Sequence, residues 1–297
     1  MLNRTLGVLL VSVLVVGCEG ATDDEGRTEG RVGEIIDNLI AAGYSEDAID
    51  VVDVEDPFSV NGVEVLSAGP QVYVDGDTHV TLEASRALLG AEDDEDAFRL
   101  WRTPGLVNNN TTICLAAATS WIPGEIGPPI YGLLSTDMIY GLVYARDNYN
   151  ALASMNLQFE ARDAQLGING NLVLLNQTGC TYVIGVARSY YINGVGGSSG
   201  FPSGNGAPYG MILANGTADN QVFEHMMTHE IGHCIGLRHS DWKTRSSCGQ
   251  NSNEGQLGAS QIPGTVDQTT NSIMGACNPP TDGEFRGEDG LALNTLY

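Results

Sequence analysis

The hydrophobic and polar positions along the chain divide it into a front part and a longer second part. From Val32 to Asp50, apolar residues recur at mostly helical spacing, which predicts a helix. The residues that carry this pattern are Ile35, Ile36, Leu39, Ile40 and Ile49. From Val72 to Leu82, apolar and polar residues alternate, which predicts a strand. Together these elements predict a small folded accessory region.

The second part is predicted to mix strands and helices, with no internal repeat. Strands are expected in three segments, Thr111–Ala116, Asn156–Glu160 and Leu172–Leu175. A helix is expected from Ser135 to Leu152. Residues 193–209 are dense in Gly, Ser, Pro and Asn, which predicts a loop. A short strand at 211–213 then leads into a helix from about Asn220 to Ile235.

The first residues predict export. Arg4 is followed by an apolar run from Leu6 to Val16, which suits a signal-peptide core but is shorter than the roughly 20 residues that a membrane-spanning helix needs. The sequence Val-Val-Gly-Cys ending at Cys18 resembles the lipobox of bacterial lipoproteins, so Cys18 is a candidate for lipidation. The alternative is an ordinary signal peptide with a chance cysteine. The expected location is the bacterial cell envelope, or outside the cell.

The negative charge is concentrated in the front part. The formal net charge is -24, and residues 19–98 hold 22 Asp and Glu against 3 Lys and Arg. Phosphates and anionic lipids attract Lys and Arg, so this balance excludes nucleic acid as a partner and leaves a lipid anchor as the only link to a membrane. Residues up to about 30 are too polar to fold and predict a linker. The run Glu92–Asp96 predicts an exposed boundary between the two parts.

Six cysteines in an exported chain predict disulfides. Without Cys18 an odd number remains, so one stays free, and the sequence does not determine the pairing among Cys114, Cys180, Cys234, Cys248 and Cys277. The last two bracket a loop-rich stretch that a covalent link would shorten. Cys234 lies within a predicted helix and is interpreted as a core or disulfide residue.

A metal site is predicted around residues 229–239. His229 and His233 are four residues apart, so on a helix they project from one face and can bind one cation. Glu230 lies beside the first ligand and can act as a general base. Gly236 can adopt the left-handed conformation that ends a helix, which brings His239 back as a third ligand. Three protein ligands leave the fourth position of zinc open for water.

The length of this pattern separates it from a chance match. His-Glu-x-x-His alone occurs in many unrelated proteins. Here the longer pattern His-Glu-x-x-His-x-x-Gly-x-x-His is complete, and three of the five histidines of the chain supply it. His225, one turn before His229, is interpreted as a helix-surface residue.

The run from His229 to His239 resembles the zinc sequence of the metzincin clan, and Ser272-Ile273-Met274-Gly275 resembles that clan's Met-turn. Further segments resemble the dual-action HEIGH metallopeptidase family. These segments are Gly200-Phe201-Pro202, Arg238-His239-Ser240-Asp241-Trp242, Ser247-Cys248, Ile262-Pro263-Gly264-Thr265, Ser272–Cys277 and, more weakly, Val72–Asp77.

The resemblance implies an α+β, metzincin-like domain with a twisted mixed sheet and a zinc helix that forms the floor of a cleft. It implies that Met274 supports the zinc ligands from below, and it favours a disulfide between Cys248 and Cys277. One position departs from the clan: some metzincins place a Tyr two residues after the Met of the Met-turn, where this chain has Ala276.

The resulting prediction is a zinc metalloendopeptidase that acts as a monomer on proteins or peptides. It comprises a signal peptide (1–18), an acidic linker and pro-region (19–100) and a catalytic domain (101–297). Zn²⁺ would lower the pKa of a bound water, and Glu230 would remove its proton. Residues near Gly210–Asn215 are expected to form an edge strand that pairs with extended substrate. The alternative function is a catalytically inactive zinc-containing surface lipoprotein that binds a partner, although the intact Glu230 argues against it.

For the front part, two roles stay open: a pro-region that covers the cleft until it is removed, or a permanently attached spacer. The chain has no cysteine-switch sequence of the type Pro-Arg-Cys-Gly. A blocking pro-region would therefore act through an acidic side chain or through steric cover.

Overall fold

The computed structural model of the 297-residue chain describes residues 24–89, 100–125, 130–152, 154–251, 254, 259–265, 272–277 and 282–297. The predicted signal peptide with Cys18 and the acidic run Glu92–Asp96 lie outside these residues. Within the described part, no helix combines the length and the apolar composition needed to cross a membrane.

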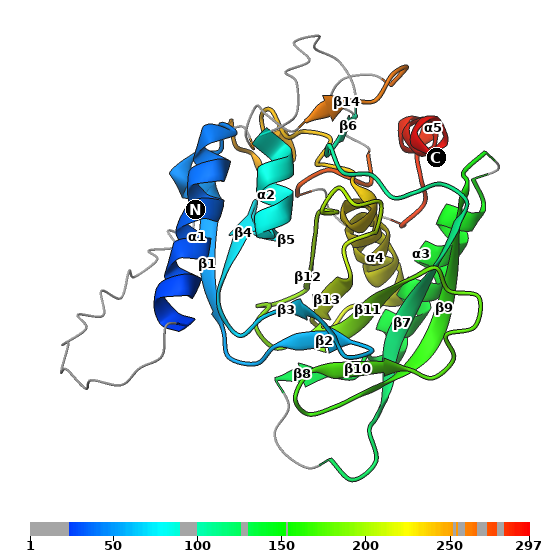
Figure 1. Cartoon of the computed structure of the whole chain (residues 1–297). Helices are drawn as coiled ribbons and strands as arrows, with labels where there is room; N and C mark the ends of the chain where they lie inside the picture. Colours follow the sequence, from blue (N-terminus) through cyan, green and yellow to red (C-terminus); the bar gives the residue numbers. More distant parts are fainter. Residues whose placement is uncertain are drawn as a thin grey trace, which may run out of the picture.

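A large mixed sheet forms the centre of the molecule (Figure 1). Its central strands are β7 (Thr111–Trp121), β9 (Leu157–Leu166), β10 (Asn171–Leu174), β11 (Tyr182–Ser189), β12 (Gly196–Gly200) and β13 (Met211–Asn215). The order β13-β11-β7-β9 is parallel throughout, whereas β12 is antiparallel to β13 and β10 is antiparallel to β9. The short β8 (Tyr131–Gly132) pairs with β11. Parallel strands are buried on both faces, which agrees with the apolar sequences of β7 and β11.

Two helices that pack against each other carry much of the core. Helix α3 (Thr136–Asn150) begins where the Ser135 side chain accepts a hydrogen bond from the Met138 N–H, and it packs against α4 (Asn220–Ile235) and β9. Gly141 of α3 allows this close approach, because an added Cβ would lie 2.6 Å from the backbone of Phe223 in α4. Helix α5 (Gly287–Leu296) ends the chain. These helices confirm a mixed α+β fold with few helices.

The front part extends the same sheet instead of forming a separate layer. Strands β1 (Ile49–Val54), β4 (Gly69–Val74) and β5 (Thr78–His79) follow β12 in the sheet order, while β2 (Phe58–Val60) and β3 (Val63–Leu66) follow β10 at the opposite end. Only three residues connect β1 to β2, and such a link spans at most about 14 Å. The two ends of the sheet therefore lie near each other, and the sheet is curled.

Helices α1 (Asp24–Ala41) and α2 (Leu82–Leu89) lie side by side over this end of the sheet (Figure 1). Their buried residues form a small core with β4 and with one residue of the second part, Phe201. Between α1 and β1 the chain forms a short 3₁₀ turn, η1 (Glu46–Ala48). The front segment, which we define as residues 24–89, thus has its own apolar cluster and also shares the main sheet.

Five sequence predictions about the fold are corrected by the structure. The stretch up to about residue 30, expected to be a linker too polar to fold, is helical from Asp24, where α1 begins. The helix expected to reach Asp50 ends at Ala41, because Gly43 turns the chain in a left-handed conformation (φ 88°) and β1 follows. The strand expected at 72–82 is interrupted by a turn at 75–77, and its end belongs to α2. The loop expected at 193–209 contains β12. The strand expected to be an edge, β13, pairs with β11 on one side and with β12 on the other.

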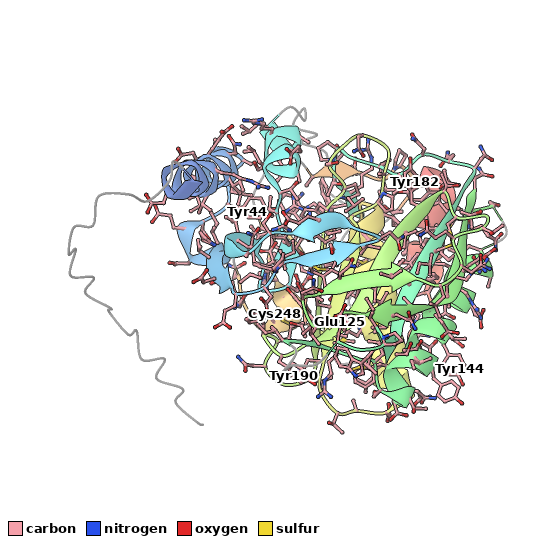
Figure 2. All side chains as sticks on the ribbon, turned by 60° about the horizontal axis from the view of Figure 1, so that its bottom comes forward. Tyr44, Glu125, Tyr144, Tyr182, Tyr190 and Cys248 are labelled. Carbon is pink, nitrogen blue, oxygen red and sulfur yellow. A yellow bond between two sulfur atoms is a disulfide. The ribbon has the colours of Figure 1, made fainter. Side chains whose placement is uncertain are left out.

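Two disulfides and two short strands complete the architecture. Cys114 is bonded to Cys180, and Cys248, labelled in Figure 2, is bonded to Cys277, which is the pairing that the family resemblance favoured. Cys234 is free and buried. Cys248 ends the short 3₁₀ helix η2 (Ser246–Cys248). Strands β6 (Trp101–Arg102) and β14 (Ser260–Gln261) form a separate two-stranded sheet.

Candidate metal centre

Helix α4 carries the histidine pattern between two well-defined ends. It begins where the Asp219 side chain accepts hydrogen bonds from two backbone N–H groups, and it ends at Gly236, whose φ of 111° only glycine adopts without strain. The turn at Gly236 directs the chain back, so that the side chains of His229, His233 and His239 converge. Their Nε2 atoms lie 3.0 Å (229 to 233), 3.2 Å (233 to 239) and 3.3 Å (229 to 239) apart.

The hydrogen bonds of the Nδ1 atoms, on the other side of each imidazole ring, show why a cation belongs between these three histidines. Each Nδ1 faces an acceptor, and the acceptors are Ile273 O at 2.8 Å, Leu237 O at 2.9 Å and Glu254 Oε1 at 2.8 Å. A carbonyl oxygen can only accept, so the Nδ1 atoms of His229 and His233 carry the hydrogen and their Nε2 lone pairs face each other.

Lone pairs held this close repel each other unless a cation lies between them. Tetrahedral zinc, with Zn–N bonds of about 2.0–2.1 Å, separates its ligand atoms by about 3.3 Å. The residues present therefore fit a tetrahedral metal ion.

Glu230 is buried beside the three histidines, with 2% of its surface exposed. Its Oε2 accepts a hydrogen bond of 2.6 Å from the Ser199 hydroxyl of β12. Burial, with a further contribution from the charge of Asp77, raises the pKa of Glu230 to about 7, although His229 and Ser199 act in the opposite direction. A carboxyl group that titrates near neutral pH can both accept and release a proton.

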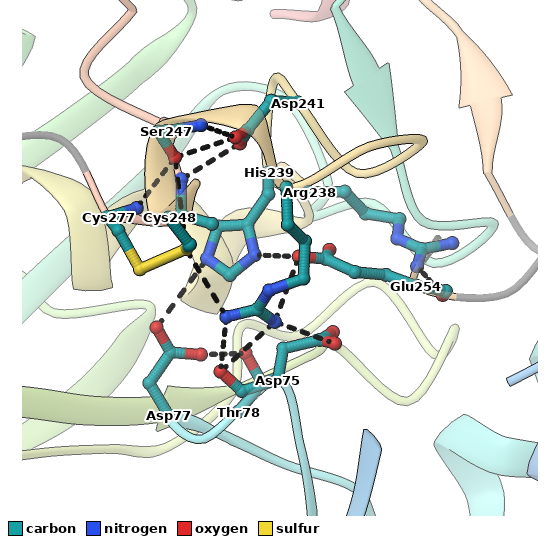
Figure 3. Close-up of polar contacts among 12 residues, drawn as sticks. Asp75, Asp77, Thr78, Arg238, His239, Asp241, Ser247, Cys248, Glu254 and Cys277 are labelled. Atoms are coloured by element: carbon teal, nitrogen blue, oxygen red, sulfur yellow. Dashed lines mark hydrogen bonds and ion pairs between the residues drawn. A yellow bond between two sulfur atoms is a disulfide. The ribbon is translucent and has the colours of Figure 1, made fainter. Parts of the chain in front are cut away.

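Asp77 is an additional carboxylate at the site that the sequence analysis did not assign. Its Oδ2 lies 3.5 Å from His239 Nε2 and 3.8 Å from His229 Nε2, and Figure 3 shows it pointing at the His239 ring. The ligand atoms of Asp77 and the three histidines all lie within 4.8 Å of one another. Burial acts to raise the pKa of Asp77, but the neighbouring imidazoles hold it well below its usual range. The fourth position expected to be open is thus faced by a carboxylate in the full chain.

Glu254 is a second residue that sequence reasoning missed. Its Oε1 accepts from His239 Nδ1 (Figure 3). The same oxygen lies 3.3 Å from Arg245 Nη1, which in turn lies 3.1 Å from Asp75 Oδ1. Asp75, His239 and Glu254 could by themselves form a second group of metal ligands. The Arg245 guanidinium already neutralises both carboxylates, so this group needs no metal ion.

A profile of the dual-action HEIGH metallopeptidase family matches residues 72–297. The chain belongs to this family. It is therefore a metallopeptidase, and the expectation of a zinc-dependent peptidase is confirmed. The match begins in β4 and includes Asp75 and Asp77, so the family pattern extends into the front segment.

Other comparisons are more distant. Two solved structures of myroilysin are similar to this chain, at 14% and 13% identity and with TM-scores of 0.36 and 0.33. The matched region covers 65% of this chain in both cases, and it covers 95% and 85% of the two myroilysin chains. No curated protein matches the chain.

In this metallopeptidase the segment 272–277 lies directly beneath the histidines. The Asp289 carboxylate in the first turn of α5 accepts hydrogen bonds from the Ser272 hydroxyl (2.6 Å) and the Ile273 N–H (3.1 Å). Met274 is buried, and its Sδ would lie 2.5 Å from a Cβ added at Gly232 of α4. The methionine and the glycine are therefore packed against each other. Ala276, the position that departs from the clan, donates its N–H to Asp241 Oδ1 at 3.0 Å.

The two remaining histidines lie apart from the group of candidate metal ligands. His225 was expected at the helix surface, but only 9% of it is exposed, because the helix is covered on this side as well. His79 of β5 is buried, with Nε2 3.1 Å from Gln71 Oε1 and Nδ1 2.7 Å from the Tyr209 hydroxyl.

Proposed function

We propose that the chain is an exported zinc metalloendopeptidase in which His229, His233 and His239 hold Zn²⁺ and Glu230 is the general base. The observation that carries this proposal is the convergence of three Nε2 atoms within 3.3 Å. Hydrogen bonds at Nδ1 fix the ring orientation, so the site is preorganised for a metal ion.

Zinc, when bound, lowers the pKa of a water molecule and polarises the carbonyl of the substrate. The residues of the chain supply the proton transfers. Glu230 accepts the proton that the attacking water loses, and its protonated carboxyl group then gives the proton to the amine nitrogen as the peptide bond breaks. The Ser199 hydroxyl holds the Glu230 carboxylate in place through its hydrogen bond of 2.6 Å.

Two further residues support this centre. Gly236 makes the turn that returns His239 to the other ligands, and Met274 packs beneath α4 as an apolar base. The disulfide between Cys248 and Cys277 links the stretch after α4 to this methionine turn. We propose that all three are structural supports and not ligands.

We assign the substrate-pairing edge to β12. One side of β12 pairs with β13, and among the described residues the other side pairs only with the two residues of β5 from the front segment. An extended peptide that adds to a sheet edge is held by its backbone, which tolerates varied side chains. β12 also carries Ser199 and so brings a bound peptide next to Glu230.

The proposed organisation keeps the sequence-based boundaries: a signal peptide at 1–18, a linker and pro-region at 19–100 and a catalytic domain at 101–297. Two disulfides fit an oxidising compartment outside the cytoplasm. We propose that lipidation of Cys18 tethers the chain to the cell envelope, that secretion is the alternative, and that the enzyme acts as a monomer on proteins or peptides.

The test uses protein recovered after export, with its N-terminus determined by mass spectrometry. Casein cleavage is measured with and without a zinc chelator, for the wild type and for Glu230→Gln. We expect cleavage by the wild type only without chelator, and no cleavage by the variant, although it still binds one zinc ion. The matched control is Glu224→Gln, since Glu224 is a buried carboxylate of the same helix that bonds to Asn148. A Glu230→Gln enzyme as fast as wild type refutes the mechanism. A wild type that binds zinc but cleaves nothing supports the alternative, a binding module.

A further inference from the structure

The turn between β4 and β5 is shaped so that Asp77 reaches the metal centre. Asp75 and Gly76 both adopt positive φ, at 60° and 86°, as tight hairpin turns require. The next residue, Asp77, is held from two directions. Its carbonyl oxygen accepts from the Ser199 N–H at 3.1 Å, and its Oδ1 accepts from the Thr78 hydroxyl at 2.9 Å. The other carboxylate oxygen, Oδ2, is left pointing at the histidines (Figure 3).

We infer that Asp77 is the fourth ligand of the zinc ion in the full chain, and that the front segment keeps the peptidase inactive until it leaves. This inference rests on the proposed metal centre. The separations of 3.5 and 3.8 Å between Asp77 Oδ2 and two Nε2 atoms are close to the spacing of about 3.3 Å expected for ligands of one tetrahedral zinc ion. Aspartate oxygen is an ordinary zinc ligand, and three imidazoles with one carboxylate complete a four-coordinate site.

A site closed in this way has no position for the water that hydrolysis requires. Catalytic zinc sites keep one coordination position open, whereas closed sites are structural. Glu230 would also have no water molecule to deprotonate, because the water oxygen would have to take the position that Asp77 Oδ2 occupies. In the full chain the Glu230 carboxylate accepts a hydrogen bond from Ser199 instead.

The same turn also blocks the proposed substrate edge. Thr78 and His79, the two residues after Asp77, pair in parallel with Ser199 and Gly200 of β12. A peptide substrate cannot add to this edge while β5 is there. Asp77, Thr78 and His79 of the front segment thus block both the open coordination position of the metal and the edge of β12 where a peptide would pair.

Further contacts hold the front segment in this place. Asp75 forms an ion pair of 3.1 Å with Arg245. The hydroxyl of Tyr44, a residue labelled in Figure 2, accepts a hydrogen bond of 2.7 Å from Arg238 Nη2, and Tyr44 forms an isolated β-bridge with Glu254. Both arginines belong to the chain that follows α4. The front segment is therefore fastened to the part of the site that positions the third histidine.

The experiment uses the full chain loaded with Co²⁺ in place of zinc, because the visible absorption of cobalt reports its ligands. Wild type is compared with Asp77→Asn, which keeps the shape of the side chain but removes its charge, and with Asp77→Ala. The control is Asp53→Asn, since Asp53 is an exposed aspartate of β1. Two quantities are measured: the cobalt spectrum, and the affinity for acetohydroxamic acid, a small chelator that needs an open position on the metal.

We expect both Asp77 variants to change the cobalt spectrum and to bind acetohydroxamic acid at least tenfold more tightly than wild type, while Asp53→Asn matches wild type. Identical spectra and affinities for wild type and Asp77→Asn would overturn the inference, even if all proteins bind one cobalt ion. Failure of the wild type to bind cobalt would instead refute the metal centre itself. A change in Asp77→Ala alone would show that Asp77 acts by filling space, which also contradicts its assignment as a ligand.

Discussion

Replacing Gly197 with Ala should displace the proposed general base, Glu230, without unfolding the protein. A Cβ at this position of β12 would lie 2.5 Å from Glu230 Oε1 and 2.7 Å from Glu230 Cγ. Ordinary contacts begin at 3.4 Å, so the carboxylate must move by about 0.9 Å. The backbone of Gly197 has no positive φ, and an alanine there costs no backbone strain.

The size of the effect follows from this displacement. A shift of about 1 Å in a group that positions the reacting atoms can cost about 100-fold in rate. We therefore expect kcat/KM of the exported, processed enzyme for a peptide substrate to fall about 100-fold. Zinc content, measured by atomic absorption, should stay at one ion per chain. The overlap with the buried Glu230 side chain should lower the free energy of unfolding by about 1–3 kcal/mol, while the protein stays folded.

The matched control is Gly196→Ala, one residue earlier in the same strand. Its added Cβ would meet only the Ile192 side chain, at 3.3 Å, and would not touch Glu230. This variant should cleave at about the wild-type rate. If Gly197→Ala keeps its full kcat/KM, or if both variants lose activity equally, the position of Glu230 against β12 does not govern the rate and the reasoning fails.

Three further substitutions test other contacts. Glu254→Gln removes the charged acceptor of the third histidine and should weaken zinc binding about 10- to 100-fold in a chelator competition, while Glu224→Gln should leave it unchanged. Cys277→Ser opens a disulfide that spans 29 residues and should lower the free energy of unfolding by about 3–4 kcal/mol; a denaturation midpoint equal to wild type would contradict this. Gly232→Ala places a methyl group 2.5 Å from the buried sulfur of Met274 and should cost about 1–3 kcal/mol of stability and reduce zinc content, and unchanged values would show that the packing is loose.

The parts of the site that the sequence could predict are those set by local geometry. Helix α4 has the predicted bounds, Asn220 to Ile235, because a capping aspartate and a terminal glycine mark its ends. Residues four apart on a helix share a face whatever the rest of the fold does. The convergence of the three histidines follows from this spacing and from the turn at Gly236.

The parts that the sequence could not predict depend on pairing between distant segments. β12 consists only of Gly and Ser, so it lacks the apolar alternation that identifies a strand, and its place is set by β13 and β5. Asp77 reaches the histidines only because β5 pairs with β12, more than 100 residues later. Glu254 comes from a stretch of sequence in which no hydrophobic periodicity indicates its partner.

The three hydrogen-bond acceptors behind the candidate metal ligands differ in a way that links the front segment to one histidine in particular. His229 and His233 donate to backbone carbonyls, which the turn at 272–275 and the end of α4 hold in place. His239 alone donates to a side chain, and that carboxylate shares the guanidinium of Arg245 with Asp75 of the front segment. If the front segment leaves as inferred, Glu254 loses Asp75 as its competitor for the Arg245 guanidinium, so His239 is the proposed ligand whose surroundings would change most.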